Sequence, residues 1–136
     1  MYNKILVAMA LDHGISPQML EIAQALCNPG AEIVALHVFE APPSSVSAYL
    51  GDDAVRDGFD RARQLMAEKT AHIEGITARI VRGHTYRTLI DYSSDHGVDC
   101  IVIGSHQPDF SDYLLGSTAA RVVRHAPCAV HVFRSS

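Results

Sequence analysis

The chain contains no tryptophan and few cysteines, and neither its basic nor its apolar residues gather in long runs. Its three cysteines, Cys27, Cys100 and Cys128, form no Cys-x-x-Cys pair, which argues against a disulfide framework and predicts small buried thiols in a reducing compartment. The net charge is −4 without a Lys/Arg cluster, so nucleic acid is not an expected partner. No apolar run approaches the ~20 residues that span a bilayer, so no membrane contact is expected.

The length and the first residues favour one cytoplasmic domain. The chain has 136 residues, 48% of them hydrophobic and 19% charged, which fits a single globular domain over residues 1–136. The apolar run that follows Met1-Tyr2-Asn3-Lys4 is about six residues long, too short for the core of a signal peptide. We therefore predict a cytoplasmic location.

Short apolar runs alternate with helical patterns along the chain. The predicted strands are 5–8, 33–39, 77–82, 98–103 and 129–133, and the predicted helices are about 17–27, 52–74, 85–96 and 114–125. This alternation predicts an α/β fold with a parallel sheet and helices on both faces. Polar and apolar residues alternate only in the third strand, which suggests that it lies at an edge.

Two glycines in the last third of the chain predict an anion site. The apolar run 101–103 ends at Gly104, and twelve positions later Gly116 with Ser117 and Thr118 opens a helix. Glycines let the backbone approach a ligand closely, and N–H groups at a helix start attract phosphate. A glycine inside a helix costs roughly 1 kcal/mol relative to alanine, so Gly116 indicates close approach. Taken singly, Gly104 is also compatible with a simple turn, and Ser117 and Thr118 with helix caps.

This pattern resembles the motif of the universal stress protein family: glycine, two residues, glycine, nine residues, then glycine followed by Ser or Thr. Gly104-Ser105-His106 matches its opening, Leu114-Leu115-Gly116-Ser117 its close, and 124–128 its usual continuation into the last strand. The resemblance covers the whole chain. It implies a five-stranded parallel doubly wound sheet of order 3-2-1-4-5 with four helices, the adenine-nucleotide alpha-hydrolase-like fold.

The motif departs from the family pattern at two places. Gln107-Pro108 stands where the second glycine belongs, in an interval that is one residue short, as in a branch of small members that bind ATP. Ala10 replaces the acidic residue that usually follows the first strand, and Asp12 lies two residues further on. The first departure favours retained binding, whereas both leave a nucleotide-free interaction dimer as an alternative.

The resemblance implies an ATP site formed by nine residues. They are Ala8, Met9 and Val38 at the adenine, Gly104 and His106 along the ribose and phosphates, Gly116, Ser117 and Thr118 as phosphate donors, and Ile103 beside Ala8. Mg²⁺ would arrive with ATP, because it needs only one or two protein oxygens; the candidates are Asp12, Asp109 and Asp112.

No catalytic motif accompanies this site. The eight histidines lack metal-ligand spacing, and no lysine follows a glycine loop as in a Walker motif. Gly104-Ser105-His106 is not a nucleophile elbow. We therefore expect no resident metal, no catalytic residue, and at most slow ATP hydrolysis or autophosphorylation on Ser117 or Thr118.

The last strand, 129–133, is an apolar edge that invites pairing. The resemblance implies that it pairs antiparallel with its symmetry mate in a homodimer, with Val130, Val132 and Phe133 at the interface. The expected function is thus a cytoplasmic, ATP-binding signalling dimer of the stress response. The nucleotide-free dimer and the slow ATPase remain as alternatives.

Overall fold

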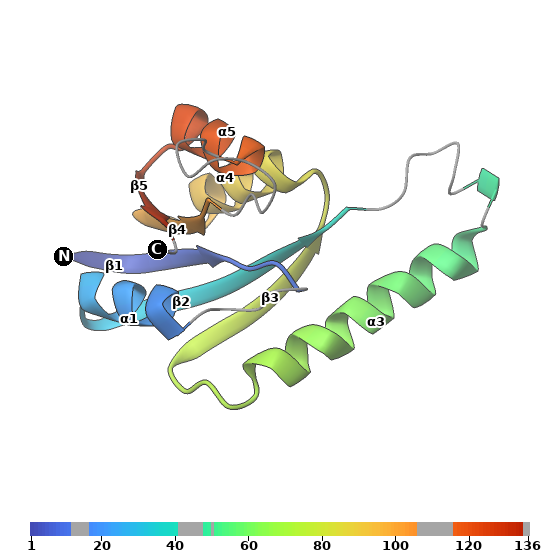
Figure 1. Ribbon diagram of the computed structural model, residues 1–136, viewed down its shortest axis with the longest axis horizontal. Coiled ribbons are helices and arrows are strands. Elements are labelled where there is room, and N and C mark those ends of the chain that lie inside the picture. Colours follow the sequence, from blue (N-terminus) through green and yellow to red (C-terminus); the bar gives the residue numbers. More distant parts are fainter. Residues whose placement is uncertain (12–16, 41–47, 50, 106–115, 135–136) are drawn as a thin grey trace.

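A computed structural model describes residues 1–11, 17–40, 48–49, 51–105 and 116–134 of the chain. Strands and helices alternate along these residues (Figure 1). The strands are β1 (Tyr2–Ala8), β2 (Cys27–Phe39), β3 (Ile76–Arg82), β4 (Cys100–Gly104) and β5 (Ala129–Phe133). The helices are α1 (Pro17–Leu26), α3 (Asp52–Thr70), α4 (Thr85–Asp95) and α5 (Ser117–His125).

The strands form one parallel sheet in the order β3-β2-β1-β4-β5. This confirms the predicted α/β class and strand order, and it places β3 at an edge as its alternating pattern indicates. β1 lies at the centre, where Ile5, Leu6 and Val7 are completely buried. A central parallel strand is covered on both faces, which explains its continuous apolar run. The order reverses between β1 and β4.

Helices cover both faces of the sheet (Figure 1). Leu6 and Ile101 belong to a cluster that includes residues of α4 and α5, whereas Ile5 and Val102 pack with residues of α1 on the opposite face. Met66 of α3 joins a third, smaller cluster at the end of the sheet. Successive residues of these strands thus pack against helices on opposite faces of the sheet, as the pleat requires.

The second strand begins earlier than the sequence predicts. The helical pattern extends through Cys27, but the structure places Cys27 in β2, opposite Tyr2. The register of β1 with β2 shifts directly after this pair, which accommodates residues 28–30. Gly30 has a φ of +79°, a conformation that favours glycine. The prediction was wrong here because pairing with β1 outweighs helical periodicity.

Two helix ends also differ from the prediction. α3 ends at Thr70 and not near residue 74, and the N–H of Ile73 donates to the Thr70 carbonyl in the turn that follows, at 3.0 Å. Gly75, with a φ of +80°, then leads the chain into β3. α5 begins at Ser117; Leu114 and Leu115, where the sequence predicts its start, lie outside the described residues.

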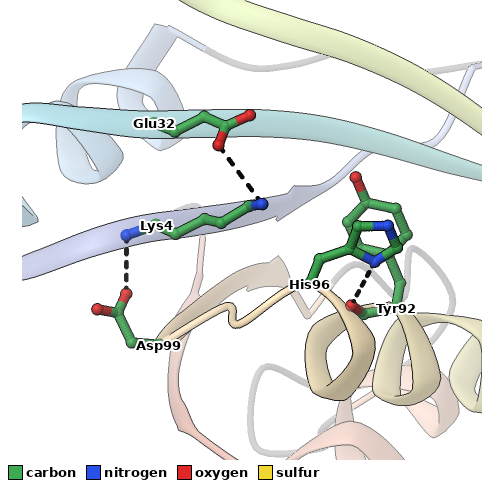
Figure 2. Close-up of polar contacts among 5 residues, drawn as sticks. All are labelled: Lys4, Glu32, Tyr92, His96 and Asp99. Atoms are coloured by element: carbon green, nitrogen blue, oxygen red, sulfur yellow. Dashed lines mark hydrogen bonds and ion pairs between the residues drawn. The ribbon is translucent and has the colours of Figure 1, made fainter.

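Polar contacts hold the amino end of the sheet together (Figure 2). Asp99 accepts the N–H groups of Asn3 and Lys4 at 2.9 and 3.0 Å, and its own N–H donates to the Lys4 carbonyl at 3.0 Å. The ammonium of Lys4 forms an ion pair with Glu32 on β2 at 3.4 Å. Lys4 thereby connects the central strand to both of its neighbours.

The same figure shows the end of α4. The rings of Tyr92 and His96 stack with their centroids 3.9 Å apart, and Nδ1 of His96 lies 3.0 Å from the Tyr92 carbonyl oxygen. The main-chain N–H of His96 donates to the same carbonyl at 3.0 Å. Ring and main chain together close the last turn of the helix.

The three cysteines are free, and Cys100 is the buried one, while Cys27 and Cys128 are half-buried. Burial raises the pKa of the Cys100 thiol to about 11, so it stays protonated at neutral pH. Such a thiol behaves as a small hydrophobic side chain, as the sequence predicts.

Candidate functional site

The carboxyl ends of β1 and β4 lie side by side where the strand order reverses. Val7 pairs with Val102, and the two strands continue to Ala8 and Gly104 at the same edge of the sheet. In an open parallel sheet, the crevice for a ligand lies beyond this reversal point. The structure therefore brings the predicted residues of β1 and β4 together at the expected edge.

β2 fixes the main chain of Met9 on the other side of β1. The N–H of Met9 donates to the Leu36 carbonyl at 2.9 Å. Nδ1 of His37 lies 2.8 Å from the Met9 carbonyl oxygen, and since a carbonyl only accepts, this nitrogen carries the hydrogen. Met9 and Val38 are 5% and 6% exposed. The main chain of Met9 is thus held by β2. The sequence did not reveal that His37 makes one of these two contacts.

The start of α5 supplies amides that have no partner within the helix. Gly116 is the buried N-cap, and its carbonyl accepts the N–H of Ala120 at 2.8 Å. The N–H groups of Ser117, Thr118 and Ala119 precede this first helical bond, so the helix offers them no carbonyl. Ser117 is exposed and Thr118 half-buried. Because they lie at the positive end of the helix dipole, these amides favour an anion.

The structure changes the reason for a glycine at position 116. Gly116 is the N-cap and not an interior residue of the helix, so the cost of an interior glycine does not apply. Its φ of −57° and ψ of 150° are open to other residues as well. What remains is its burial at the start of α5.

Gly104 has room for a small side chain among the described residues. A Cβ built on it would meet only the Sδ of Met19, at 3.9 Å, which is an ordinary contact. The next amide, that of Ser105, donates to the Phe133 carbonyl of β5 at 3.0 Å and is therefore engaged in the sheet. His106, like Gln107-Pro108 and the three candidate Mg²⁺ ligands, lies outside the described residues.

An acidic residue that the sequence did not single out lies at the same end of the sheet. Oε1 of Glu40 accepts the N–H of Thr85 at 2.7 Å and its hydroxyl at 2.6 Å. These two hydrogen bonds lower the pKa of the Glu40 carboxyl, and nearby His84 adds to the effect. Glu40 caps the start of α4 and ties it to the end of β2. The available signal was a Thr at a predicted helix start, but its partner is 45 residues away.

Neither a metal centre nor a membrane span was found in the part of the chain that the structure describes. No group of three or more His, Cys, Asp or Glu side chains there is arranged to hold a metal ion. Within the same residues, no helix has both the length and the apolar character needed to cross a membrane.

The parallel order 3-2-1-4-5, with a helix N-terminus at the reversal point, defines a doubly wound α/β protein. The family model of the universal stress protein family matches residues 1–134. Universal stress protein A homolog 2 of Coxiella burnetii is 32% identical over 143 residues, which cover 98% of this chain and 95% of that protein. The chain therefore belongs to the universal stress protein family.

Solved structures of the family share the fold. Universal stress protein UspA from Lactobacillus plantarum superposes with a TM-score of 0.67 at 24% identity, covering 98% of each chain. A universal stress protein in complex with cAMP superposes with a TM-score of 0.59 at 21% identity, covering 99% of this chain and 98% of the other. A family protein from Arabidopsis thaliana with AMP bound superposes with a TM-score of 0.60 at 19% identity, covering 98% of this chain and 92% of the other.

Proposed function

We propose that this protein binds an adenine nucleotide, ATP with Mg²⁺, at the carboxyl edge of the sheet and acts as a signalling module of the stress response. The amides at the start of α5 support this proposal, because they precede the first hydrogen bond of the helix that follows β4, the strand beside the reversal point of the sheet. Family members with bound cAMP and AMP lend it further support. The module would be a single cytoplasmic domain over residues 1–136.

The proposed site keeps the nine predicted residues. They are Ala8, Met9 and Val38 near the adenine, Ile103, Gly104 and His106 in the middle, and Gly116, Ser117 and Thr118 at the phosphates. The main-chain N–H and carbonyl of Met9 both form hydrogen bonds with β2, so Met9 would provide a rigid surface against which the adenine packs. Mg²⁺ would enter with the nucleotide and keep most of its waters.

Thermal unfolding in the presence of nucleotides tests the proposal directly. At about a hundred times its dissociation constant, a ligand of the folded state stabilises it by roughly 2.7 kcal/mol. We expect a shift of this size with ATP–Mg²⁺, while parallel runs with AMP and cAMP report how much the phosphates contribute. An unchanged melting curve with all three nucleotides would favour the nucleotide-free dimer.

Slow phosphate transfer is the second function to test. The protein would be incubated with ATP labelled at the γ-phosphate. If Ser117 is an acceptor, labelled phosphate should stay on the protein or be released from it slowly. The label should disappear in Ser117→Ala and persist in Ser94→Ala, an exposed serine on α4. Equal labelling of both variants would exclude Ser117 as the acceptor.

We also propose a homodimer through β5. This strand is the outer edge of the sheet, and Val130, Val132 and Phe133 are only half-buried in one chain. Sedimentation should show a dimer for the native chain and a monomer for Val132→Lys. The matched control is Val123→Lys on α5, where the valine is already 48% exposed. A dimer that survives Val132→Lys, in a variant with a native circular dichroism spectrum, would place the contact elsewhere.

A further inference from the structure

A groove of about 410 Å³ lies between α3 and β3, and none of the nine residues proposed for the nucleotide lines it. Figure 1 shows α3 running alongside β3. The helix contributes Phe59, Arg63 and Met66 to the groove, and the strand contributes Ala78, Arg79 and Ile80. The groove therefore lies between one helix and the edge strand β3.

One side of this groove is the edge of the sheet. β3 lies at the end of the strand order and pairs with β2 alone among the described strands. Its outer side thus presents main-chain N–H and C=O groups that no strand of the described chain satisfies, and such an edge readily accepts another strand. Arg79 folds back on its own strand, where Nη1 donates to the Ala78 carbonyl at 3.2 Å.

The floor of the groove is apolar and firmly held. The Phe59 ring packs edge-on against Phe39, with the centroids 5.5 Å apart, and the Arg82 guanidinium lies 4.5 Å from the centroid of Phe59. Met66 is only 3% exposed because it packs into the sheet. Ala78 packs against the same cluster, so this residue of β3 faces α3.

The charged side chains that line the groove are all positive. Arg63 and Arg79 line it and are both exposed, and Arg82 lies next to it over Phe59. No acidic side chain is among the lining residues, although the chain as a whole has a net charge of −4. This local excess of arginine favours an occupant with carboxylates, which a guanidinium binds through two parallel hydrogen bonds.

We propose that this groove binds an extended segment of a partner protein in which apolar and acidic residues alternate. The segment would add a strand to β3 through main-chain hydrogen bonds. Successive side chains of a strand point to opposite faces, so its apolar residues would contact Phe59 and Ile80 on the α3 side and its carboxylates would reach Arg79 on the other face. Arg63, on the α3 side, would add a longer-range attraction for the acidic segment. β3 has seven residues, so about seven residues of the partner, roughly 23 Å, would be in contact.

A designed peptide tests the proposal on the intact protein. The probe is fluorescein-labelled Glu-Ile-Glu-Val-Glu-Ile-Glu with blocked ends, followed by fluorescence anisotropy. Two matched peptides separate the contributions: one has Lys in place of every Glu, and the other has Pro in place of the central Val. We expect the acidic peptide to bind, the Lys peptide to bind at least tenfold more weakly, and the Pro peptide to lose binding because it lacks a main-chain donor.

Variants of the protein locate the binding. Arg63→Glu and Arg79→Glu should each weaken binding of the acidic peptide about tenfold or more. Arg61→Glu, an exposed residue of the same helix that does not line the groove, should leave binding unchanged. Circular dichroism establishes that each variant folds, and Arg79→Gln provides a milder second variant.

Several results would overturn the proposal. These are absence of binding by the acidic peptide, equal binding of the Lys peptide, and equal effects of Arg61→Glu and Arg63→Glu. Dissociation of an oligomer by Arg63→Glu in sedimentation experiments would also overturn it, because a second copy of the chain would then be the occupant of the groove.

Discussion

Each end of the sheet contains a carboxylate that accepts two hydrogen bonds, but one carboxylate joins two strands and the other caps a helix. At the amino end, Asp99 accepts main-chain N–H groups of Asn3 and Lys4 and thus joins β4 to β1. At the carboxyl end, Glu40 takes both bonds from Thr85 and closes the start of α4. Among the described residues, no side chain caps the start of α5, whose N-cap is Gly116. The amino end is cross-linked by hydrogen bonds between strands, whereas the helix start at the carboxyl end that lacks a side-chain cap among the described residues is the one proposed to bind phosphate.

The largest expected effect comes from filling that helix start. Gly116→Val should abolish the nucleotide-induced stabilisation of roughly 2.7 kcal/mol, because a branched side chain would obstruct the amides of Ser117 and Thr118. The measurement is the melting temperature with and without ATP–Mg²⁺. Ala120→Val, an exposed position on the same helix, serves as the control and should respond like the native chain. A full nucleotide response in a folded Gly116→Val variant would mean that the phosphates bind elsewhere.

Removing the cross-link at the amino end should affect stability and not binding. Asp99→Ala leaves two main-chain N–H groups without their carboxylate, and we expect the free energy of unfolding to fall by about 2 kcal/mol. Urea denaturation measures this change, and the nucleotide-induced shift should persist. Asp95→Ala, an exposed position at the end of α4, should change stability by less than about 0.5 kcal/mol. Similar losses of stability for both variants would show that the hydrogen bonds of Asp99 make no specific contribution.

A smaller, pH-dependent effect is expected at Glu40. Its pKa lies below the ordinary value of 4.5 because Thr85 donates two hydrogen bonds to the carboxylate. A lowered pKa in the folded state means that Glu40 stabilises the fold above that ordinary value, and that the contribution disappears as the pH falls through the folded-state pKa. Because the side chain is exposed, we expect Glu40→Gln to cost less than about 1 kcal/mol at pH 7.

Thermal unfolding at pH 7 and at a pH well below 4.5 checks this prediction. The difference between Glu40→Gln and the native chain should be present at the first pH and absent at the second. Thr85→Val, which removes the hydroxyl donor, should show the same trend with a smaller amplitude. A difference that stays constant with pH would show that the carboxylate charge is irrelevant to the cap.

The smallest effect is predicted for the ion pair at the amino end. Lys4 and Glu32 are separated by 3.4 Å, with side chains 23% and 50% exposed. Exposed pairs of this kind contribute little, so Lys4→Met should lower the free energy of unfolding by less than about 0.5 kcal/mol. Equilibrium unfolding in low and high salt measures it. A loss comparable to that of Asp99→Ala would show that the ion pair contributes as much to this end as the main-chain hydrogen bonds of Asp99.

The fold could be predicted because local patterns decide it. The continuous apolar run of β1 and the alternating pattern of β3 indicate a central and an edge strand, and both strands lie at those places. Cys27 shows where local reasoning stops, since its pairing with Tyr2, 25 residues away in the sequence, overrides a helical pattern. A register shift of this kind depends on the neighbouring strand, which periodicity along one segment does not report.

The site was predictable in part. The glycines and hydroxyl residues at 104 and 116–118 could be recognised because a helix start and a strand end have local signals. The contact of Glu40 with Thr85 and that of His37 with Met9 could not, because each joins residues 28 or more positions apart. The helix-cost argument for Gly116 failed for another reason, namely a difference of three residues in where α5 begins.

If the proposed nucleotide site and dimer both exist, the hydrogen bond from Ser105 to Phe133 would connect them. It links the residue after Gly104 directly to the end of the strand proposed to join two copies of the protein. A nucleotide that repositions Ser105 would therefore alter the free energy of subunit association. Thermodynamic reciprocity then requires association to change nucleotide affinity by the same factor, so this one contact would couple occupancy to assembly in both directions.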